Sequence, residues 1–155
     1  MEKKTKPIKE RLNAHREMLE KLEALKQELE FAKAQYGSIP GPNYSGMPRG
    51  GGSSELTREE AIVYKKIELE KKVEAKKSEI ERDWEKLEPF VERLKPSETL
   101  LIRLRYYYGA EWEDVCKGIY GRARDYDVEL DRYMNRMFKM HGRALLELSE
   151  ICAEF

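Results

Sequence analysis

Two segments with a long hydrophobic repeat stand on either side of a stretch that cannot form a helix, and this arrangement constrains the fold most. In residues 1–36 the apolar positions recur at steps of four, seven, three and seven. They are Ile8, Leu12, Leu19, Leu22 and Leu29. This spacing, with Pro7 in a first helical turn, predicts a long helix with a narrow apolar seam. His15 also falls on the seam, as a polar residue tolerated in a narrow interface.

Residues 37–56 interrupt the repeat. Of the eighteen residues from Gly37 to Ser54, thirteen are Gly, Pro or Ser, and none is acidic. Such a composition buries too little apolar surface to offset the entropy of the chain, so we expect a flexible loop. Its RGGGSS run lacks the Lys-Ser/Thr ending of a phosphate-binding P-loop and follows no strand, which excludes that motif.

A second long helix is predicted over residues 57–94. Thr57, followed by Glu60 three residues later, forms a capping-box signature for its start. The apolar positions that follow keep heptad-like spacing: Ile62, Leu69, Val73, Ile80, Trp84, Leu87, Val91 and Leu94. Pro89 predicts a kink or a short break, because proline disfavours helical geometry in the preceding residue. Two such helices joined by a loop predict an antiparallel, coiled-coil-like hairpin, and the same seams leave open a homodimer.

Residues 95–155 hold shorter amphipathic patterns and predict a compact helical domain. Ser97 is expected to cap a helix that ends at Gly109. Its apolar positions are Leu100, Leu101, Leu104 and Tyr108, while Arg103 and Arg105 are expected to face water or a nucleic acid. The next helix is expected to end at Gly121, with an inward side formed by Trp112, Val115, Cys116 and Ile119. Asp125 or Asp127 can cap the last helix.

The last predicted helix separates apolar and cationic residues most clearly. At 3.6 residues per turn, one side gathers Leu130, Tyr133, Met137, His141, Ala144 and Leu148, extended by Ile151. On the opposite side, steps of four, three and four align Arg132, Arg136, Lys139 and Arg143 in one stripe. A small core can therefore hold this helix while its outer side is offered to an anion.

The overall composition excludes several classes of protein. The formal net charge is +0, so an attraction to nucleic acid must come from a local excess, such as the seven Lys/Arg against four Asp/Glu between Lys117 and Arg143. Cys116 and Cys152 are expected to be small buried hydrophobes in a reducing compartment. We expect no metal site, cofactor or catalytic group. No apolar run is long enough to cross a bilayer, so a cytoplasmic protein without a membrane partner is expected.

Parts of the sequence resemble a known DNA-binding region. The stretch LKPSETLLIRLRYYYGAEWEDV resembles the fourth region of sigma-70-type factors, and MHGRALLEL resembles the tail of that region's recognition helix. Together with YSGMPRGGG, the chain resembles small phage and prophage proteins related to the ArpU/RinA-like regulators of late genes. The resemblance implies an all-α fold, a helix-turn-helix, binding to promoter DNA, and a possible contact with RNA polymerase.

The resemblance also implies roles for individual residues. Trp112 and Val115, with Gly121 closing their helix, would support the helix-turn-helix. The residues that would face double-stranded DNA are Arg132, Asn135, Arg136, Lys139 and Arg143. From Trp112 to Leu145 the chain is about ten residues longer than the usual motif, with RARDYDVELDR as the excess over the usual turn of three or four residues. The alternative interpretations are that the stripe is an ordinary solvated face, or that the protein is a helical adaptor that binds a partner through its hairpin.

Overall fold

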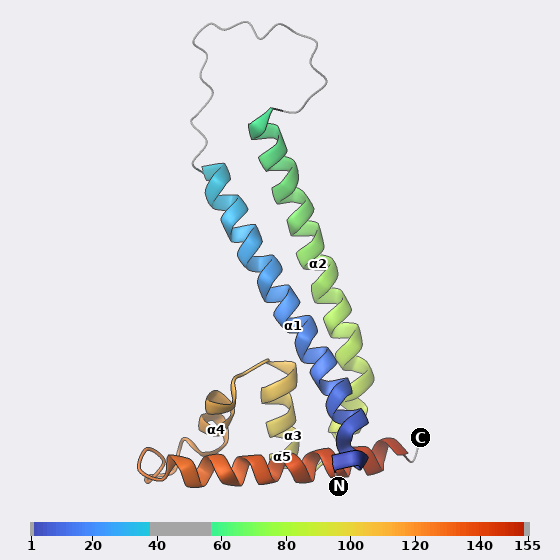
Figure 1. Cartoon of the computed structure of the whole chain (residues 1–155), viewed down its shortest axis with the longest axis vertical. Coiled ribbons are helices and arrows are strands. Elements are labelled where there is room, and N and C mark those ends of the chain that lie inside the picture. Colours follow the sequence, from blue (N-terminus) through green and yellow to red (C-terminus); the bar gives the residue numbers. More distant parts are fainter. Residues whose placement is uncertain (1, 38–56, 154–155) are drawn as a thin grey trace, which may run out of the picture. The chain divides into compact units, whose positions relative to one another are not determined.

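The computed structural model describes residues 2–37 and 57–153, and every regular element in this part of the chain is helical (Figure 1). The elements are α1 (Glu2–Gly37), α2 (Arg58–Val91), α3 (Pro96–Ile102), the π-helix η1 (Arg103–Tyr107), α4 (Trp112–Tyr120) and α5 (Leu130–Ala153). The predicted all-α fold with a long N-terminal helix pair is therefore confirmed. The loop expected over residues 37–56 lies, apart from Gly37, outside the described residues. None of the described helices has a stretch long and apolar enough to span a membrane.

The chain divides into two compact units, which cut across both long helices. Unit 1 comprises residues 1–19 and 79–155, and unit 2 comprises residues 20–78. In unit 2 the second half of α1 and the first half of α2 run antiparallel (Figure 1). The side chains buried along their seam are Leu22, Leu29, Ala32, Leu69 and Val73. The heptad-like spacing therefore predicted the contact face of this pair correctly.

Unit 1 has one hydrophobic core, and it is not confined to residues 95–155. Ile8 and Leu12 of α1 and Trp84, Leu87 and Val91 of α2 belong to it. The contributions from the later elements are Leu94, Leu101, Ile102, Tyr106, Val115, Cys116, Met137, Met140, Ala144, Leu145, Leu148 and Ile151. The core thus joins the beginning of the chain to α5, and α5 also contacts both α3 and α4.

The sequence predicted N-cap residues for α2 and α3, and the structure confirms the first of them. The Thr57 hydroxyl accepts the backbone N–H of Glu60 at 3.1 Å, so the predicted N-cap of α2 is confirmed. The predicted cap at Ser97 is wrong, because α3 starts at Pro96 with Lys95 as its N-cap. Proline is favoured in this first position, since its missing N–H would have no partner in the helix anyway.

Both prolines within long helices are tolerated. The helix α1 starts at Glu2, so Pro7 lies inside it and does not open it. The break predicted near Pro89 is also absent, because α2 continues to Val91. Glu88, just before Pro89, is held by side chains on both sides: Trp84 Nε1 donates to its carboxylate at 2.5 Å, and Arg103 donates to the other oxygen. These bonds favour the helical position of Glu88 and so offset part of the cost of Pro89, which removes one N–H bond and crowds the carbonyl of Glu85.

The π-helix η1 changes which side chains of its segment face the core. Leu101, Ile102 and Tyr106 are buried, whereas Leu100 and Tyr108, predicted to be inward, are exposed. A π-turn adds a residue to the helical repeat, so an assignment by 3.6-residue spacing fails across it. Gly109 then ends the segment as predicted, with a φ of 73° that side chains with a Cβ rarely adopt.

Candidate nucleic-acid interface

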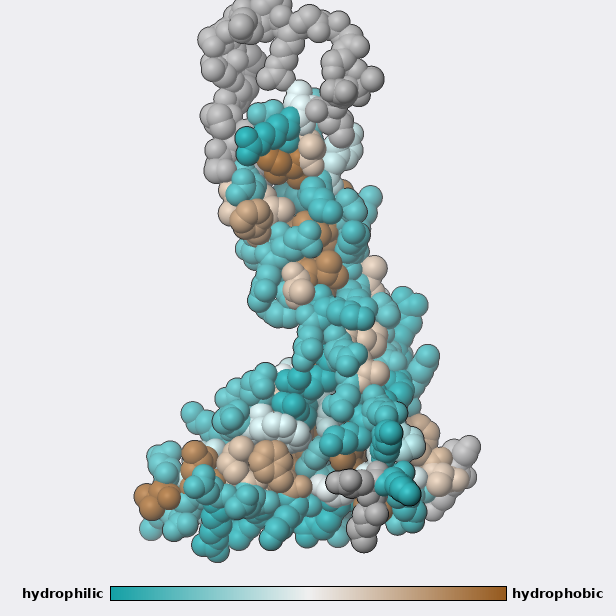
Figure 2. Space-filling view, viewed as in Figure 1, coloured by the Kyte–Doolittle hydropathy of each residue, from teal (hydrophilic) through white to brown (hydrophobic). Residues whose placement is uncertain are grey.

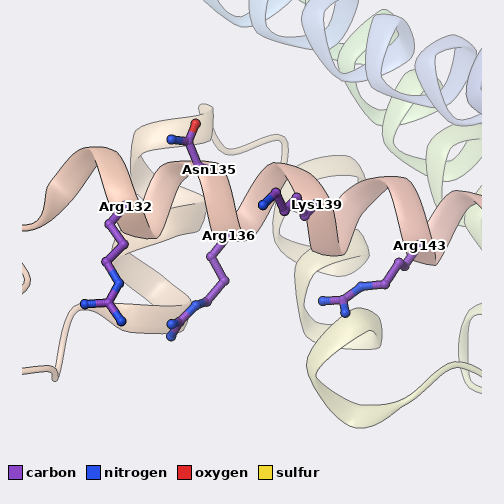
Figure 3. Close-up of a pocket in the computed structure, with 5 residues that line it drawn as sticks. All are labelled: Arg132, Asn135, Arg136, Lys139 and Arg143. Carbon is purple, nitrogen blue, oxygen red and sulfur yellow. The ribbon is translucent and has the colours of Figure 1, made fainter.

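The five residues predicted to face DNA lie along one side of α5. Arg132, Asn135, Arg136, Lys139 and Arg143 together line a shallow hollow of about 770 Å³. In Figure 3 the three arginines extend from one edge of this face, and Asn135 extends from its other edge. By helical geometry all five fall within an arc of about 100°. The structure therefore brings the predicted residues together on one face, and all of them are exposed.

The core fixes the orientation of this face. Met137 and Ala144 are fully buried on the opposite side of α5, and Leu148 and Ile151 continue the buried side toward its end. Leu130 departs from the prediction, because it is 41% exposed at the first position of α5. The helix starts at this residue, so its first turn extends beyond the packed part of the core. Figure 2 shows mostly hydrophilic side chains along the outer edge of α5.

The cations of this face are not neutralised within the described part of the chain. No ion pair there involves Arg132, Arg136, Lys139 or Arg143; the ion pairs near the ends of α5 involve other groups, such as Lys4 and Glu150, 3.9 Å apart. Among described residues, Arg136 instead lies near the rings of Tyr133 and Tyr120, with its guanidinium carbon 5.6 Å and 6.0 Å from their centroids. These ring contacts leave its N–H donors available. The face therefore presents four positive charges and one amide.

The connection from α4 to α5 is held by aromatic side chains rather than by an aspartate cap. Tyr133 stacks obliquely on Tyr120 and Tyr126, with ring centroids 5.1 Å and 5.8 Å away. Its hydroxyl donates to Oδ1 of Asp125 at 2.5 Å, a bond that raises the pKa of Tyr133. Since α5 starts at Leu130, the predicted cap by Asp125 or Asp127 is wrong. Asp125 is used to anchor the connection to the first turns of α5.

The residues expected to support the helix-turn-helix pack beneath the interface. Val115 is fully buried, and the ring of Trp112 meets Phe138 and His141 of α5 edge-on, at 5.2 Å and 4.8 Å. Gly121 follows the last residue of α4, as expected. A Cβ there would collide with the backbone oxygen of Lys117, so the chain approaches itself too closely for another residue. These contacts fix α4 against the buried side of α5.

Arg105 takes part in this support, although its sequence pattern indicated a solvent-facing cation. Its side chain is only 14% exposed, its guanidinium carbon lies 4.2 Å above the Trp112 ring, and Nη1 donates to the Ala110 carbonyl at 3.1 Å. A cation over a partly buried indole is favoured by the negative face of the ring. The π-helix places Arg105 on the inner side, and helical spacing does not predict a π-helix. In the sequence, only the nearby Trp112 could have indicated an inward position for Arg105.

The arrangement suits recognition of a polyanion. Guanidinium and ammonium groups bind phosphates, and an exposed amide can both donate to and accept from a base edge. Among residues 2–37 and 57–153, no group of three His, Cys, Asp or Glu side chains could hold a metal ion. The site must be interpreted from its own geometry, because no protein-family model, curated protein or solved structure matches the chain.

Proposed function

We propose that the protein binds double-stranded DNA through the outer face of α5 and acts as a transcriptional regulator of the phage type. The observation that carries the proposal is the stripe of four cations directly opposite a buried apolar face on the same helix, where none of the four forms an ion pair with another described residue. On an ordinary solvated helix face, basic residues alternate with acidic ones and pair with them. This is the case on α2, where Lys72 pairs with Glu68 and Lys66 with Glu70.

The dimensions of the face fit the major groove of DNA. The segment from Arg132 to Arg143 is about 16 Å long at 1.5 Å per residue, and the groove is about 12 Å wide and admits one helix. With the N-terminal half of α5 deepest, Arg132, Asn135 and Arg136 approach base edges, where arginine pairs with guanine and asparagine with adenine. Lys139 and Arg143 then meet phosphates and fix the register.

The order of elements supports a reader of the helix-turn-helix kind. The helix α4 precedes α5 and packs on its inner side, as the positioning helix of that motif does. The connection over residues 121–129 is longer than the usual three or four residues. Promoter binding, and a contact with RNA polymerase, are what the resemblance to sigma-70 region 4 adds to this geometry.

A salt series tests the proposal directly. Four phosphate contacts give a slope of log affinity against log salt of about −3.6. The variant with Arg132, Arg136, Lys139 and Arg143 replaced by alanine should lose this slope while keeping its helicity. A matched control removes four exposed lysines of α2 instead, namely Lys65, Lys71, Lys72 and Lys77. Equal loss of duplex binding in both variants, or no binding by the parent, would contradict the proposal.

A helical adaptor is the second candidate, and one observation favours it. In unit 2, Phe31 on α1 is 67% exposed, and Tyr64 and Ile67 on α2 are 61% and 42% exposed. Where such side chains form one contiguous patch, they are typical of a protein-binding surface. Replacing Phe31 and Tyr64 by serine should leave DNA binding unchanged if the first proposal holds, and should remove a protein partner if the second does.

A further inference from the structure

A second surface of unit 1 has the composition of a binding groove. A hollow of about 540 Å³ opens between α1, the end of α2 and the C-terminal end of α5. Its floor is apolar and includes Ile8, Leu87, Phe90 and Cys152. Figure 1 shows the first turns of α1 beside the C-terminal half of α5, and pale-brown atoms gather there in Figure 2. The groove lies at the opposite end of α5 from Arg132.

The rim of this groove is cationic. Lys4, Arg11 and Lys86 line it, and the lining within residues 2–37 and 57–153 includes no carboxylate. Arg11 is already neutralised, since its two terminal nitrogens donate to Asp83 at 3.1 Å and 2.6 Å. Lys4 reaches a carboxylate only at 3.9 Å, through two largely exposed side chains, and such pairs contribute little. Lys4 and Lys86 are therefore the charges that the rim can offer to a ligand.

The groove is long enough along α1 for two turns of a bound helix. On α1 the lining residues Lys4, Pro7, Ile8 and Arg11 recur at helical intervals over two turns, or about 10 Å. An amphipathic helix presents anchors at i, i+3 or i+4, and i+7 over the same length. Laid into the groove, it would contact three helices at once and cover the apolar floor.

We propose that this groove binds an acidic amphipathic helix of a partner protein. Apolar anchors of the partner fill the floor over Ile8, Leu87 and Phe90, and acidic residues on its flanks meet Lys4 and Lys86. The last residue of the DNA-facing stripe is Arg143, whereas the groove starts on α5 at Ser149, so the two surfaces share no residue. The partner can therefore bind whether or not DNA is bound.

The test uses the full chain and a fluorescein-labelled synthetic helix of about five turns, with leucine along one face and glutamate elsewhere. Its binding is measured by fluorescence anisotropy, beside a peptide in which every glutamate is replaced by lysine. The glutamate peptide should bind saturably and the lysine peptide at least about tenfold more weakly, since like charges at an interface are strongly unfavourable. Lys4→Glu with Lys86→Glu should weaken the glutamate peptide about tenfold, and Lys117→Glu on α4 should not.

Cys152 gives an independent readout at the floor of the groove. It is partly exposed, whereas Cys116 is buried, so a bulky maleimide should label Cys152 selectively. The glutamate peptide should slow this labelling. Equal binding of both peptides, or no saturable binding, overturns the proposal. Peptide binding that appears only after removal of residues 154–155 also overturns it, as does protection of Cys152 that rises with protein concentration alone, which would assign the groove to a second copy of the chain.

Discussion

The Tyr106 hydroxyl oxygen lies 2.7 Å from Nε2 of His141, and both side chains are buried in the core of unit 1. Their rings are stacked at 5.9 Å, and Trp112 meets the imidazole edge-on. Burial lowers the pKa of His141 to about 4, with Lys9 and Arg105 acting in the same direction, and raises the pKa of Tyr106 to about 12. A neutral imidazole leaves Nε2 able to accept the hydrogen of the Tyr106 hydroxyl.

This pair predicts an acid sensitivity in a definite pH range. The unfolded chain protonates His141 below its ordinary pKa of 6.5, whereas the folded protein does so only near 4. The unfolded state therefore binds more protons in between, and stability falls as the pH drops from about 6.5 to 4. At a pH below both pKa values, the free energy of unfolding would be lower by about 3 kcal/mol than at neutral pH. Urea unfolding at pH 7 and at pH 4.5 measures it.

Two variants separate His141 from the carboxylates. His141→Gln keeps an acceptor for Tyr106 but has no proton to gain, so its stability should depend less on pH across this range. Tyr106→Phe removes the hydrogen bond and should keep the pH dependence. Asp83 acts in another range: burial raises its pKa, but the hydrogen bonds from Arg11 and His15 outweigh this and lower it below 3.8. A steep loss above pH 4 that persists in His141→Gln would contradict the assignment.

The sequence predicted the elements whose signals are local. The Thr57 cap, the end at Gly109 and the buried side of α5 around Met137 depend on neighbours within one or two turns. Repeat spacing also placed His15 on a buried seam, where its side chain is 0% exposed. Such signals act within one helix, so one sequence is sufficient to recognise them.

The features that the sequence did not predict depend on residues far apart in the chain. Arg103 meets Glu88 across the turn between α2 and α3, and that contact holds Glu88 helical next to Pro89. Arg105 is largely withdrawn from solvent because η1 shifts the register and because its guanidinium lies over the ring of Trp112. The groove beside Cys152 forms only when α1, α2 and α5 meet. Helical spacing contains no information on such contacts, whereas the cationic stripe lies on one helix and its alignment could be predicted.

Replacing Gly109 by alanine should destabilise the protein by about 1–2 kcal/mol. Its φ of 73° is unfavourable for any residue with a Cβ, and that atom would lie 3.2 Å from Cδ1 of Leu19. Gly142 gives a matched control within α5, because a Cβ there meets nothing within 4 Å. Gly142→Ala should stabilise by about 0.5–1 kcal/mol, since glycine is a poor helix former. Thermal unfolding followed by circular dichroism measures both, and the same sign for the two variants would contradict this geometry.

Removing the Asp83 carboxylate should destabilise unit 1 by about 2 kcal/mol. The carboxylate accepts two bonds from Arg11 and lies 2.7 Å from Nδ1 of the fully buried His15. Asp83→Ala leaves both partners without an acceptor. Glu85→Ala on the exposed side of α2 is the control and should change the free energy of unfolding by less than about 0.5 kcal/mol. Equal effects in urea titrations would mean that the network contributes nothing.

Alanine substitutions in the proposed DNA interface should affect either the salt dependence of binding or the discrimination between sequences, depending on the residue. Lys139→Ala should weaken binding to all duplexes alike and reduce the salt slope by about 1, because it removes one phosphate contact. Asn135→Ala should keep the slope and lose about tenfold or more in discrimination between a selected sequence and its single-base variants. Titrations of both variants against the same duplexes, across a salt series, distinguish the roles. A reduced slope for Asn135→Ala would place its side chain on the backbone instead.

The core of unit 1 predicts which fragment of the chain can fold by itself. A fragment of residues 95–155 contains α3 to α5 but lacks Leu12, Trp84 and Val91, which are buried among them. Removing this much apolar contact from a small domain exceeds ordinary stability, so the fragment should show no cooperative unfolding.

A matched chain keeps residues 1–19 and 79–155 and replaces residues 20–78 with a short glycine-serine linker. It retains every residue of the unit 1 core, because Leu12 and Trp84 come from the parts that remain. It should therefore unfold cooperatively, with a midpoint close to that of the whole protein, and keep the proposed DNA interface on α5. Circular dichroism melts of the two chains decide the question. Cooperative folding of residues 95–155 alone would show that α1 and α2 merely cover a core that is already complete.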